Sequence, residues 1–317
     1  MKRIAILTSG GDAPGMNAAI RAVVRACKIK NIRVYGVRNG FQGLLDEDIE
    51  ELNRKSVSEK LSKGGTFLGT ARVADFYKEE VQAKAADNLK RRGIDGLVTI
   101  GGDGTFRGAL GLSKKGISVI AIPGTIDNDI EGTDFTIGFD TALQTAVEAV
   151  DKLKDTSSSH RRCSIVEVMG RECGDLAIWT GIASGAEFVV AKEVGYHIDD
   201  IIENVREAAE VKNHAIIIVA ENMVDINELA KVISEKTPFS ARTTILGHIQ
   251  RGGTPTARDR VLASQMGAKA VDALLEGESG NAVCIRNNQI ITVPIEDALR
   301  KDDSQALELY ELLRELW

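Results

Sequence analysis

Two stretches of this chain set its architecture: Leu97-Val-Thr-Ile-Gly-Gly-Asp-Gly-Thr105 and Val119-Ile-Ala-Ile-Pro-Gly-Thr-Ile-Asp-Asn-Asp129. Each begins with a short apolar run and ends in a loop that contains glycine and aspartate. Neighbouring parallel strands bring the loops that follow them to the same edge of a sheet, where ligands bind in open α/β folds. The two stretches therefore predict adjacent parallel strands with a binding site at their carboxyl ends.

Strand-like and helix-like segments alternate along the rest of the chain, which predicts parallel sheets with helices on both faces. The predicted strands are residues 3–8, 33–37, 97–100, 119–122, 164–168, 215–220 and 243–246, followed by 282–286 and 289–293 around a hairpin turn at Asn287-Asn288. The predicted helices are residues 17–28, 83–92, 141–154, 201–210, 227–235 and 257–276.

The composition is that of an ordinary globular protein, with 43% hydrophobic and 27% charged residues. The length of 317 residues predicts two domains with large cores. The net charge of −6 argues against a general nucleic-acid binder, whose surface is basic, and no apolar run approaches the roughly 20 residues of a membrane span. The first strand gives way to Ser9-Gly-Gly-Asp12 too early for a signal peptide, and the four cysteines show no CxxC spacing. We therefore expect a cytoplasmic protein with reduced thiols.

A third glycine loop, Thr8-Ser-Gly-Gly-Asp-Ala-Pro-Gly-Met-Asn17, follows the first predicted strand. It leads into a predicted helix, with Asn17 as the expected N-cap residue. Such a loop suits an anion, because the amide groups and the helix dipole favour negative charge, although a tight turn that binds nothing has the same sequence. The loop is neither the GxGxxG pattern of dinucleotide sites nor a P-loop, since it lacks Gly-Lys-Ser/Thr.

Aspartates in the two opening loops are the candidate metal-binding and catalytic groups. Asp103 lies between glycines after a strand, where its carboxylate can reach Mg²⁺ while the loop amides hold phosphates. Asp127 or Asp129 can act as a base toward an acceptor hydroxyl if the Pro123-Gly124 turn holds it nearby. Two carboxylates one residue apart are otherwise often a simple turn or a helix cap. Together the loops indicate phosphoryl transfer.

Basic residues in other loops offer charge to a phosphorylated substrate, because arginine binds phosphate bidentately and a neutral imidazole donates one further hydrogen bond. Taken singly, such residues are more often solvated or structural. Glu221, after a predicted strand, can bond a sugar hydroxyl or cap a helix. The basic candidates are Arg72, Arg162, Arg171, Arg242, His248 and Arg251.

Five motifs, in order along the chain, resemble those of bacterial ATP-dependent 6-phosphofructokinases. They are Gly10-Gly-Asp-Ala-Pro-Gly-Met-Asn17, Gly101-Gly-Asp-Gly-Thr105, residues 123–129, Met169-Gly-Arg171 and Gly247-His-Ile-Gln-Arg-Gly-Gly253. The likeness runs from Met1 to at least Pro294. It implies two doubly wound three-layer αβα domains with mostly parallel sheets and an active site in the cleft between them. The implied ATP-binding domain is 1–138 plus 251–301, and the implied fructose 6-phosphate domain is 139–250 plus 302–317.

The resemblance implies transfer of the γ-phosphoryl group of ATP to the 1-hydroxyl of fructose 6-phosphate, with Mg²⁺ as the metal. Asp127 resembles the general base, and Asp103 and Asp129 resemble the metal ligands. The other implied catalytic residues are Thr125, Arg171, Gly11 and Arg72. The implied ATP contacts are Gly11, Arg72, Val73, Gly102, Asp103, Gly104 and Thr105. The implied sugar-phosphate contacts are Thr125, Ile126, Asp127, Arg162, Met169, Gly170, Arg171, Glu221, Arg242, His248, Ile249, Gln250 and Arg251.

The resemblance also implies a homotetramer, in which Arg162 and Arg242 reach into a neighbouring subunit's site, and an effector site for ADP and phosphoenolpyruvate. Arg21 and Arg25, at i and i+4, are otherwise a solvated like-charge pair. Lys154 stands where the family usually has arginine, and the 211–214 loop is shorter and less basic, so the direction of the response stays open. The implied effector contacts are Arg21, Ala22, Val23, Val24, Arg25, Arg54, Glu59, Lys154, Gly185, Ala186, Glu187, Lys212, Asn213 and His214.

Two glycines bear on the choice of phosphoryl donor. Pyrophosphate-dependent relatives carry aspartate in place of Gly104 and lysine in place of Gly124, and a carboxylate at 104 would repel the α-phosphate of ATP. ATP is therefore the expected donor, with pyrophosphate as the alternative. A different kinase with a Gly-Gly-Asp-Gly-Thr loop should lack residues 123–129 and 247–253, and a catalytically silent nucleotide sensor should have lost Asp103 or Asp127.

Overall fold

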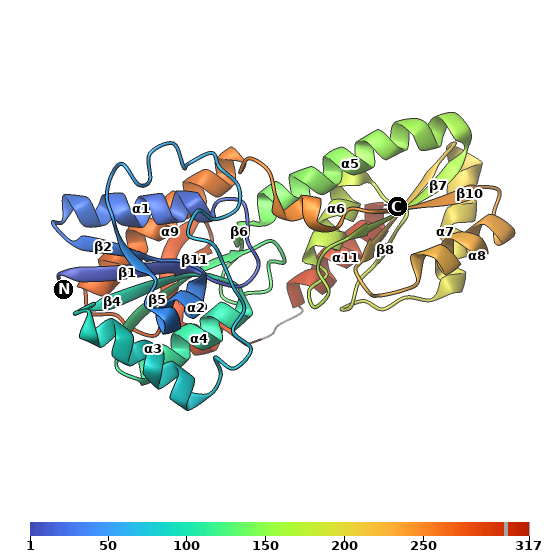
Figure 1. Ribbon diagram of the computed structural model, residues 1–317. Helices are drawn as coiled ribbons and strands as arrows, with labels where there is room; N and C mark the ends of the chain where they lie inside the picture. The colour runs from blue at the N-terminus through green and yellow to red at the C-terminus, as the bar shows by residue number, and fades with distance from the viewer. Residues whose placement is uncertain (301–303, 317) are drawn as a thin grey trace. The chain divides into compact units, whose positions relative to one another are not determined.

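The computed structural model describes residues 1–300 and 304–316, which divide into two compact units (Figure 1). Among these residues the first unit comprises 1–141 and 251–300, and the second comprises 142–250 and 304–316. None of the helices in this part of the chain combines the length and the apolar composition of a membrane span.

The first unit is built on a mixed, mainly parallel sheet that has eight strands within the described residues. The strand order is β12-β11-β5-β4-β1-β2-β3, with β6 beside β5, and only the pairs β2/β3 and β11/β12 are antiparallel. The chain runs from β1 to one side and from β4 to the other, so the order switches between β1 and β4. The strands are β1 (Arg3–Thr8), β2 (Arg33–Val37), β3 (Ile49–Leu52), β4 (Gly96–Gly101), β5 (Ser118–Thr125), β6 (Ile137–Gly138), β11 (Asn281–Arg286) and β12 (Gln289–Pro294).

Helices cover both faces of this sheet because its central strands are apolar on both sides. In β1, Ala5 and Leu7 pack against α2, α3 and α4, whereas the alternate residues Ile4 and Ile6 are buried on the opposite face. On that opposite face α1 lies along α9 (Figure 1). The helices are α1 (Met16–Ile29), α2 (Gly40–Asp46), α3 (Glu79–Arg91), α4 (Asp103–Lys114), α9 (Ala257–Leu275) and α10 (Ile295–Ala298).

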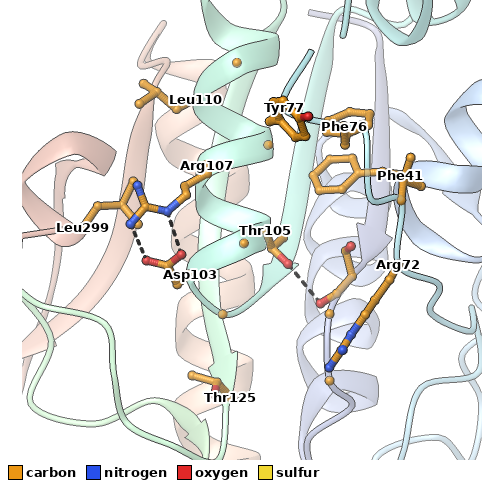
Figure 2. Close-up of a pocket in the computed structure, with 18 of the residues that line it drawn as sticks. Phe41, Arg72, Phe76, Tyr77, Asp103, Thr105, Arg107, Leu110, Thr125 and Leu299 are labelled. Atoms are coloured by element: carbon orange, nitrogen blue, oxygen red, sulfur yellow. Dashed lines mark hydrogen bonds and ion pairs between the residues drawn. The ribbon is translucent and has the colours of Figure 1, made fainter. Parts of the chain in front are cut away.

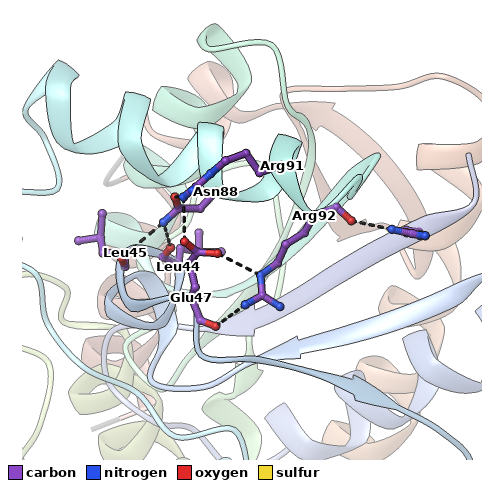
Figure 3. Close-up of polar contacts among 7 residues, drawn as sticks. Leu44, Leu45, Glu47, Asn88, Arg91 and Arg92 are labelled. Atoms are coloured by element: carbon purple, nitrogen blue, oxygen red, sulfur yellow. Dashed lines mark hydrogen bonds and ion pairs between the residues drawn. The ribbon is translucent and has the colours of Figure 1, made fainter.

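Polar contacts fasten the end of α2 to α3 (Figure 3). The buried side chain of Asn88 donates a hydrogen bond of 2.7 Å to the carbonyl of Leu44. Arg91 and Arg92 both donate to the Glu47 carboxylate, at 2.8 and 3.4 Å, and Arg92 also donates to the Glu47 carbonyl at 2.9 Å. The last carbonyls of a helix have no partner within it, so these side chains satisfy groups that the short helix α2 leaves open.

The second unit has a four-stranded parallel sheet, in the order β10-β7-β9-β8 within the described residues. In β9, Ile216 and Ile218 pack on the side of α5, α6 and α11, and Ile217 and Val219 pack on the side of α7 and α8. The elements are α5 (Phe139–His160), β7 (Arg162–Val168), α6 (Asp175–Ser184), β8 (Phe188–Val190), α7 (Ile198–Val211), β9 (Ala215–Ala220), α8 (Ile226–Lys236), β10 (Ser240–Ile245), the 3₁₀ turn η1 (Gly247–Arg251) and α11 (Ser304–Leu316).

The predicted fold class is confirmed: each unit is a mainly parallel sheet between helices. Each predicted strand and helix is present, with ends that differ by a few residues. The hairpin turn is also confirmed, since Asn287 and Asn288 have φ of 50° and 61°, the left-handed conformation of a type I′ turn. The helix α4 was not predicted, because Gly104, Gly108 and Gly111 lower its helix propensity.

Candidate active site

Three loops of the first unit meet at the carboxyl edge of its sheet, after β1, β4 and β5. The parallel register aligns Thr8 with Ile100, and Gly101 with Pro123, so the strands end at the same level. The amide of Ser9 donates to the carbonyl of Ile100 at 3.0 Å. The three glycine loops that the sequence singled out are therefore brought together by the fold.

The loop after β4 turns directly into α4, whose N-cap is Gly102. The Thr105 hydroxyl, buried in the first turn, donates to the Ser9 carbonyl at 3.0 Å. A Cβ atom on Gly101 would lie 2.3 Å from the Thr105 Oγ1 and 2.4 Å from the Ser9 carbonyl oxygen, so only glycine fits here. Open amides and the positive end of the helix dipole make this turn suitable for a phosphate.

The loop that follows β1 shows one error in the sequence prediction. Helix α1 begins at Met16 with Gly15 as its N-cap, so Asn17 is not the cap residue. Its buried side chain instead donates to the carbonyls of Lys63 and Gly64 at 3.0 and 3.2 Å and accepts from the amide of Phe67 at 2.9 Å. The preference of asparagine for caps was overridden by a contact to a segment about fifty positions away, which local sequence does not reveal.

A cavity of about 910 Å³ opens over these loops, in the size range of small-molecule sites. All residues that line it belong to the first unit. The predicted residues among them are Gly11, Arg72, Val73, Gly102, Asp103, Gly104, Thr105, Thr125, Ile126, Asp127, Asp129 and Arg251. Arg251 reaches the loop after β1, since its Cζ would lie 3.6 Å from a Cβ atom on Gly11.

The sequence analysis missed the apolar part of the cavity. Phe41 and Phe76 stack there with ring centroids 4.0 Å apart, and Tyr77 lies beside them (Figure 2). A Cβ atom on Gly108 would lie 2.6 Å from Phe41, so a glycine in α4 allows the rings to approach the helix. Flat rings beside a phosphate-binding turn provide a surface for a nucleotide base. The available signal was in the glycines at 108 and 111, because glycines in a helix allow a neighbour to approach closely, but the helix itself was not predicted.

The loop after β5 is held by several hydrogen bonds. The Thr136 hydroxyl donates to the Thr125 carbonyl at 2.6 Å, and the Thr136 amide donates to the Asn128 side chain at 2.9 Å. The amide of Asp127 donates to the Thr125 hydroxyl at 3.2 Å. Asn128 has a φ of 57°, which turns the chain sharply between the two aspartates. Its own hydrogen bonds therefore hold this segment in one conformation.

Asp103 makes a bidentate ion pair with Arg107, one turn further along α4 (Figure 2). Arg107 Nε and Nη2 donate to the two carboxylate oxygens at 2.7 and 2.9 Å. The hydrogen bond to Asp103 raises the pKa of the Arg107 guanidinium, against the opposing effect of burial. Arg107 was not among the predicted site residues, because the helix that places it at i+4 was not predicted.

The described residues contain no cluster of three or more histidine, cysteine or carboxylate side chains that could hold a metal. Mg²⁺ does not need one, since it usually binds through one or two carboxylates together with substrate phosphates. Asp103 and Asp129 line the same cavity as the phosphate-binding turn. The donor set therefore fits a magnesium ion that arrives with a nucleotide.

The predicted sugar-phosphate residues of the second unit fall into two groups. One group follows the carboxyl ends of parallel strands. The amide of Glu221 donates to the Val168 carbonyl at 2.8 Å, and the amide of Leu246 donates to the Glu167 carbonyl at 3.0 Å, so the loops after β7, β9 and β10 start at one edge. This edge group comprises Met169, Gly170, Arg171, Glu221, His248, Ile249 and Gln250. Gln250 is buried and accepts from the Met169 amide at 2.9 Å.

Arg162 and Arg242 form the other group. Arg162 is the first residue of β7, and Arg242 pairs with Ser164 near the start of β10. At about 3.3 Å per residue, the backbone of Arg162 lies roughly 20 Å from the end of β7, and that of Arg242, which is level with Ser164, lies roughly 13 Å from it. The structure therefore does not bring the two groups of the second unit together.

The predicted effector residues are also spread over both units. In the first unit, Arg21 and Arg25 lie on α1, and burial together with the Arg25 charge lowers the pKa of Arg21. The side chains of Val23 and Val24 are buried in the core, and Ala22, Arg54 and Glu59 are at least partly exposed.

In the second unit, Lys212 forms an ion pair with the buried Glu187, which also accepts from the Ile216 amide. His214 lies beside them. Burial lowers the pKa of His214, the positive charges of Lys212 and Lys154 lower it further, and the negative charge of Glu187 opposes the shift. Gly185, Ala186 and Asn213 flank this group in the chain. The fold thus gathers Lys154, Glu187, Lys212 and His214.

Comparison of the sequence with known proteins finds matches in one family. A sequence model of the family described as phosphofructokinase matches residues 3–274. The chain is 54% identical over 317 residues to a protein of Lysinibacillus sphaericus named ATP-dependent 6-phosphofructokinase, covering 100% of this chain and 99% of the relative. It is 52% identical over 320 residues to the protein of the same name from Staphylococcus epidermidis, with the same coverage.

Solved structures agree with the sequence comparison. The phosphofructokinase of Saccharomyces cerevisiae aligns with a TM-score of 0.88 at 37% identity, over 100% of this chain and 48% of that chain. This chain therefore spans about half the length of the yeast protein's chain. A pyrophosphate-dependent phosphofructokinase from Marinobacter aquaeolei aligns with a TM-score of 0.84 at 18% identity, which shows a shared fold alone.

Proposed function

This chain belongs to the phosphofructokinase family, and we propose that it transfers the γ-phosphoryl group of ATP to the 1-hydroxyl of fructose 6-phosphate. The observation that carries the proposal is the meeting of residues 101–105 and 123–129 in one cavity. The first loop supplies a phosphate-binding helix N-terminus, and the second supplies carboxylates and the Thr125 hydroxyl. A phosphoryl-transfer enzyme needs these two functions side by side.

The residues around Gly104 support ATP as the donor. Gly104 is exposed, and nothing lies within 4 Å of a Cβ atom built on it, so the space above the first turn of α4 is open to a nucleotide. An aspartate there would place a negative charge at a helix N-terminus that is otherwise suited to the phosphates of ATP. A Cβ atom on Gly124 would lie 2.8 Å from Ile100 Cγ2, so a lysine is hard to place.

We assign the steps of the reaction to residues on both sides of the transferred group. Asp127 takes the proton from the attacking 1-hydroxyl, and Thr125, Arg72 and Arg171 bind the transferring phosphoryl group. Asp103 and Asp129 hold Mg²⁺, which supplies positive charge against the charge of the phosphates when it is bound. Positioning and charge stabilisation account for most of the rate in this class of reaction.

We assign the sugar 6-phosphate to Arg162, Arg242, His248 and Arg251, with Glu221 and Met169 on the sugar. The strand-length separation within one chain supports a site shared between subunits, because Arg162 and Arg242 then serve the site of a neighbouring copy. A homotetramer is the assembly proposed. ADP and phosphoenolpyruvate are the proposed effectors, and the cations Arg21, Arg25, Lys154 and Lys212 supply the charge that such anions require.

A coupled assay of fructose 1,6-bisphosphate formation tests the function. The wild type should use ATP and not pyrophosphate. Asp127→Ser should lower kcat by roughly 10²–10⁴ while fructose 6-phosphate still binds, because a lost base slows the proton transfer and leaves ground-state contacts intact. Asp75→Ser removes an exposed carboxylate paired with Lys78 and should leave kcat unchanged.

Two outcomes would contradict the proposal. Turnover of Asp127→Ser near the wild-type rate would exclude Asp127 as the base. Activity of the wild type with pyrophosphate and not with ATP would overturn the choice of donor while leaving the family and the acceptor in place.

A further inference from the structure

The ion pair between Asp103 and Arg107 occupies both oxygens of the carboxylate that we assign to the metal. Arg107 Nε and Nη2 donate to Oδ1 and Oδ2 at 2.7 and 2.9 Å, and both residues line the nucleotide cavity. Mg²⁺ binds carboxylate oxygens at about 2.0–2.1 Å. A divalent cation beside Asp103 and a guanidinium in this bidentate position would also repel each other. The metal and Arg107 in this position therefore compete for the Asp103 carboxylate.

The ion pair between Asp103 and Arg107 contributes little to the stability of the fold, so Arg107 can be displaced from it. The Arg107 side chain is 62% exposed and the Asp103 side chain is 35% exposed. Exposed ion pairs at i and i+4 contribute little net stability, because water solvates both partners well. A stronger ligand for Asp103 can therefore displace Arg107 at small cost.

The displaced guanidinium stays at the cavity, since it projects from α4 beside the phosphate-binding turn (Figure 2). A free metal ion offers it no new partner. A metal–nucleotide complex does, because its phosphate oxygens accept bidentate hydrogen bonds from arginine. Binding of the complex thus exchanges one charged contact of Arg107 for another, whereas binding of the bare ion only removes one.

We propose that Arg107 is a specificity-determining residue that blocks Asp103 against free divalent cations and passes to the phosphates when a metal–nucleotide complex binds. The proposal rests on the assignment of Asp103 to the metal in the proposed function. It explains why a metal ligand should carry an arginine one helical turn away. It also predicts that the metal enters with the nucleotide rather than before it.

The test measures equilibrium binding of two probes to the full-length protein: Mn²⁺ alone, followed by its electron paramagnetic resonance signal, and the preformed Mn²⁺ complex of β,γ-methylene-ATP, followed by calorimetry. Arg107→Gln should bind Mn²⁺ alone about two- to fivefold more tightly, as expected from the loss of an exposed ion pair. It should bind the Mn²⁺ complex of the analogue about tenfold or more weakly, as expected from the loss of a hydrogen bond between charged groups. The proposal therefore predicts that Arg107→Gln gains affinity for Mn²⁺ alone and loses affinity for the second probe.

Matched variants make the result interpretable. Lys114→Gln removes another cation that lines the cavity on α4, but Lys114 pairs with Glu296 and not with Asp103. It should leave the affinity for Mn²⁺ alone unchanged. Arg107→Lys keeps the charge without the planar fork, so it should recover part of the affinity for the analogue.

Several outcomes would overturn the proposal: an unchanged affinity of Arg107→Gln for Mn²⁺ alone, a loss of affinity for both probes, or an equal gain in Lys114→Gln. A failure of the proposed function looks different. In that case Asp103→Asn would bind Mn²⁺ together with the analogue as tightly as the wild type does, whatever Arg107→Gln shows.

Discussion

Gly101 and Gly104 lie on either side of the same phosphate-binding turn, yet their surroundings differ. A Cβ atom on Gly101 would meet the Thr105 hydroxyl at 2.3 Å and the Ser9 carbonyl at 2.4 Å, both in buried positions. A Cβ atom on Gly104 would meet nothing within 4 Å. The first glycine is required by packing, and the second is required only by what binds above it.

Alanine at these two positions should separate the two roles. Gly101→Ala should destabilise the protein by about 1–3 kcal/mol, the usual cost of overpacking, and should weaken nucleotide binding because the turn must shift. Gly104→Ala should leave the free energy of unfolding unchanged or raise it by up to about 1 kcal/mol, since alanine favours the helix. Urea unfolding of both variants checks this, and a stable Gly101→Ala variant would contradict the packing argument.

At the scale of single residues, sequence reasoning grouped several candidate site residues that lie in one cavity but did not identify their hydrogen-bond partners. Asp103, Asp127 and Thr125 do line one cavity, as the glycine loops indicated. The partner of Asn17 is a segment near residue 64, which no local pattern indicates. Arg107 was missed for a different reason, namely that its contact with Asp103 exists only once α4 is helical.

Hydrogen bonds connect the first turns of the helices α5 and α9. Asp259 of α9 is buried, and its carboxylate accepts from the Gly138 and Thr141 amides, each at 2.9 Å. In return, the Thr256 hydroxyl at the N-cap of α9 donates to Asp140 of α5 at 2.5 Å. Gly138 also belongs to β6, which pairs with Gly124 and Thr125 of β5. This reciprocal capping therefore supports the end of β5, where the loop with Asp127 begins.

Asp259→Asn should lower the free energy of unfolding by about 1–3 kcal/mol, because the new amide group faces a backbone N–H and leaves a buried donor unsatisfied. Asp272→Asn provides the control on the same helix: it removes an exposed ion pair with Lys30 and should cost at most about 1 kcal/mol. Chemical denaturation measures both. If both variants lowered the free energy of unfolding equally, the buried hydrogen bonds of Asp259 would stabilise the protein no more than the exposed ion pair of Asp272 does.

At the scale of elements, periodicity predicted most of the helices and central strands, and it missed the short elements, the glycine-rich helix α4, and the helices α6 and α11. The strand β9 was predicted because isoleucines and valines continue through it, a pattern typical of a strand buried on both faces. The helix α4 was missed because its first residues were assigned to the glycine loop 101–105 and its later glycines lower its helix propensity. They are helical because Gly108 and Gly111 admit Phe41 and Gln82 closely against the backbone, so tertiary packing outweighs propensity there.

For the whole molecule, the separation of Arg162 and Arg242 from the edge group has a functional consequence. If these arginines serve a neighbouring subunit, Asp127→Ser and Arg162→Ser damage different halves of each shared site. Refolding the two variants together should restore activity at low fructose 6-phosphate, with about a quarter of sites intact after random assortment in a symmetric oligomer. A mixture no more active than its separate components would contradict the shared site.

The order of strands and helices and the identity of the reactive loops were encoded locally, in the alternation of apolar periods and in glycines placed after strands. Local pattern carries this information because burial on one or both faces repeats along each element. Which polar groups meet was not encoded in that way. Asp103 with Arg107, Asp259 with Gly138, and Asn17 with Gly64 became partners through helix formation in a glycine-rich segment or through closure of long loops. Those contacts depend on the packing of the whole unit, because their partners come together only when the chain has folded around them.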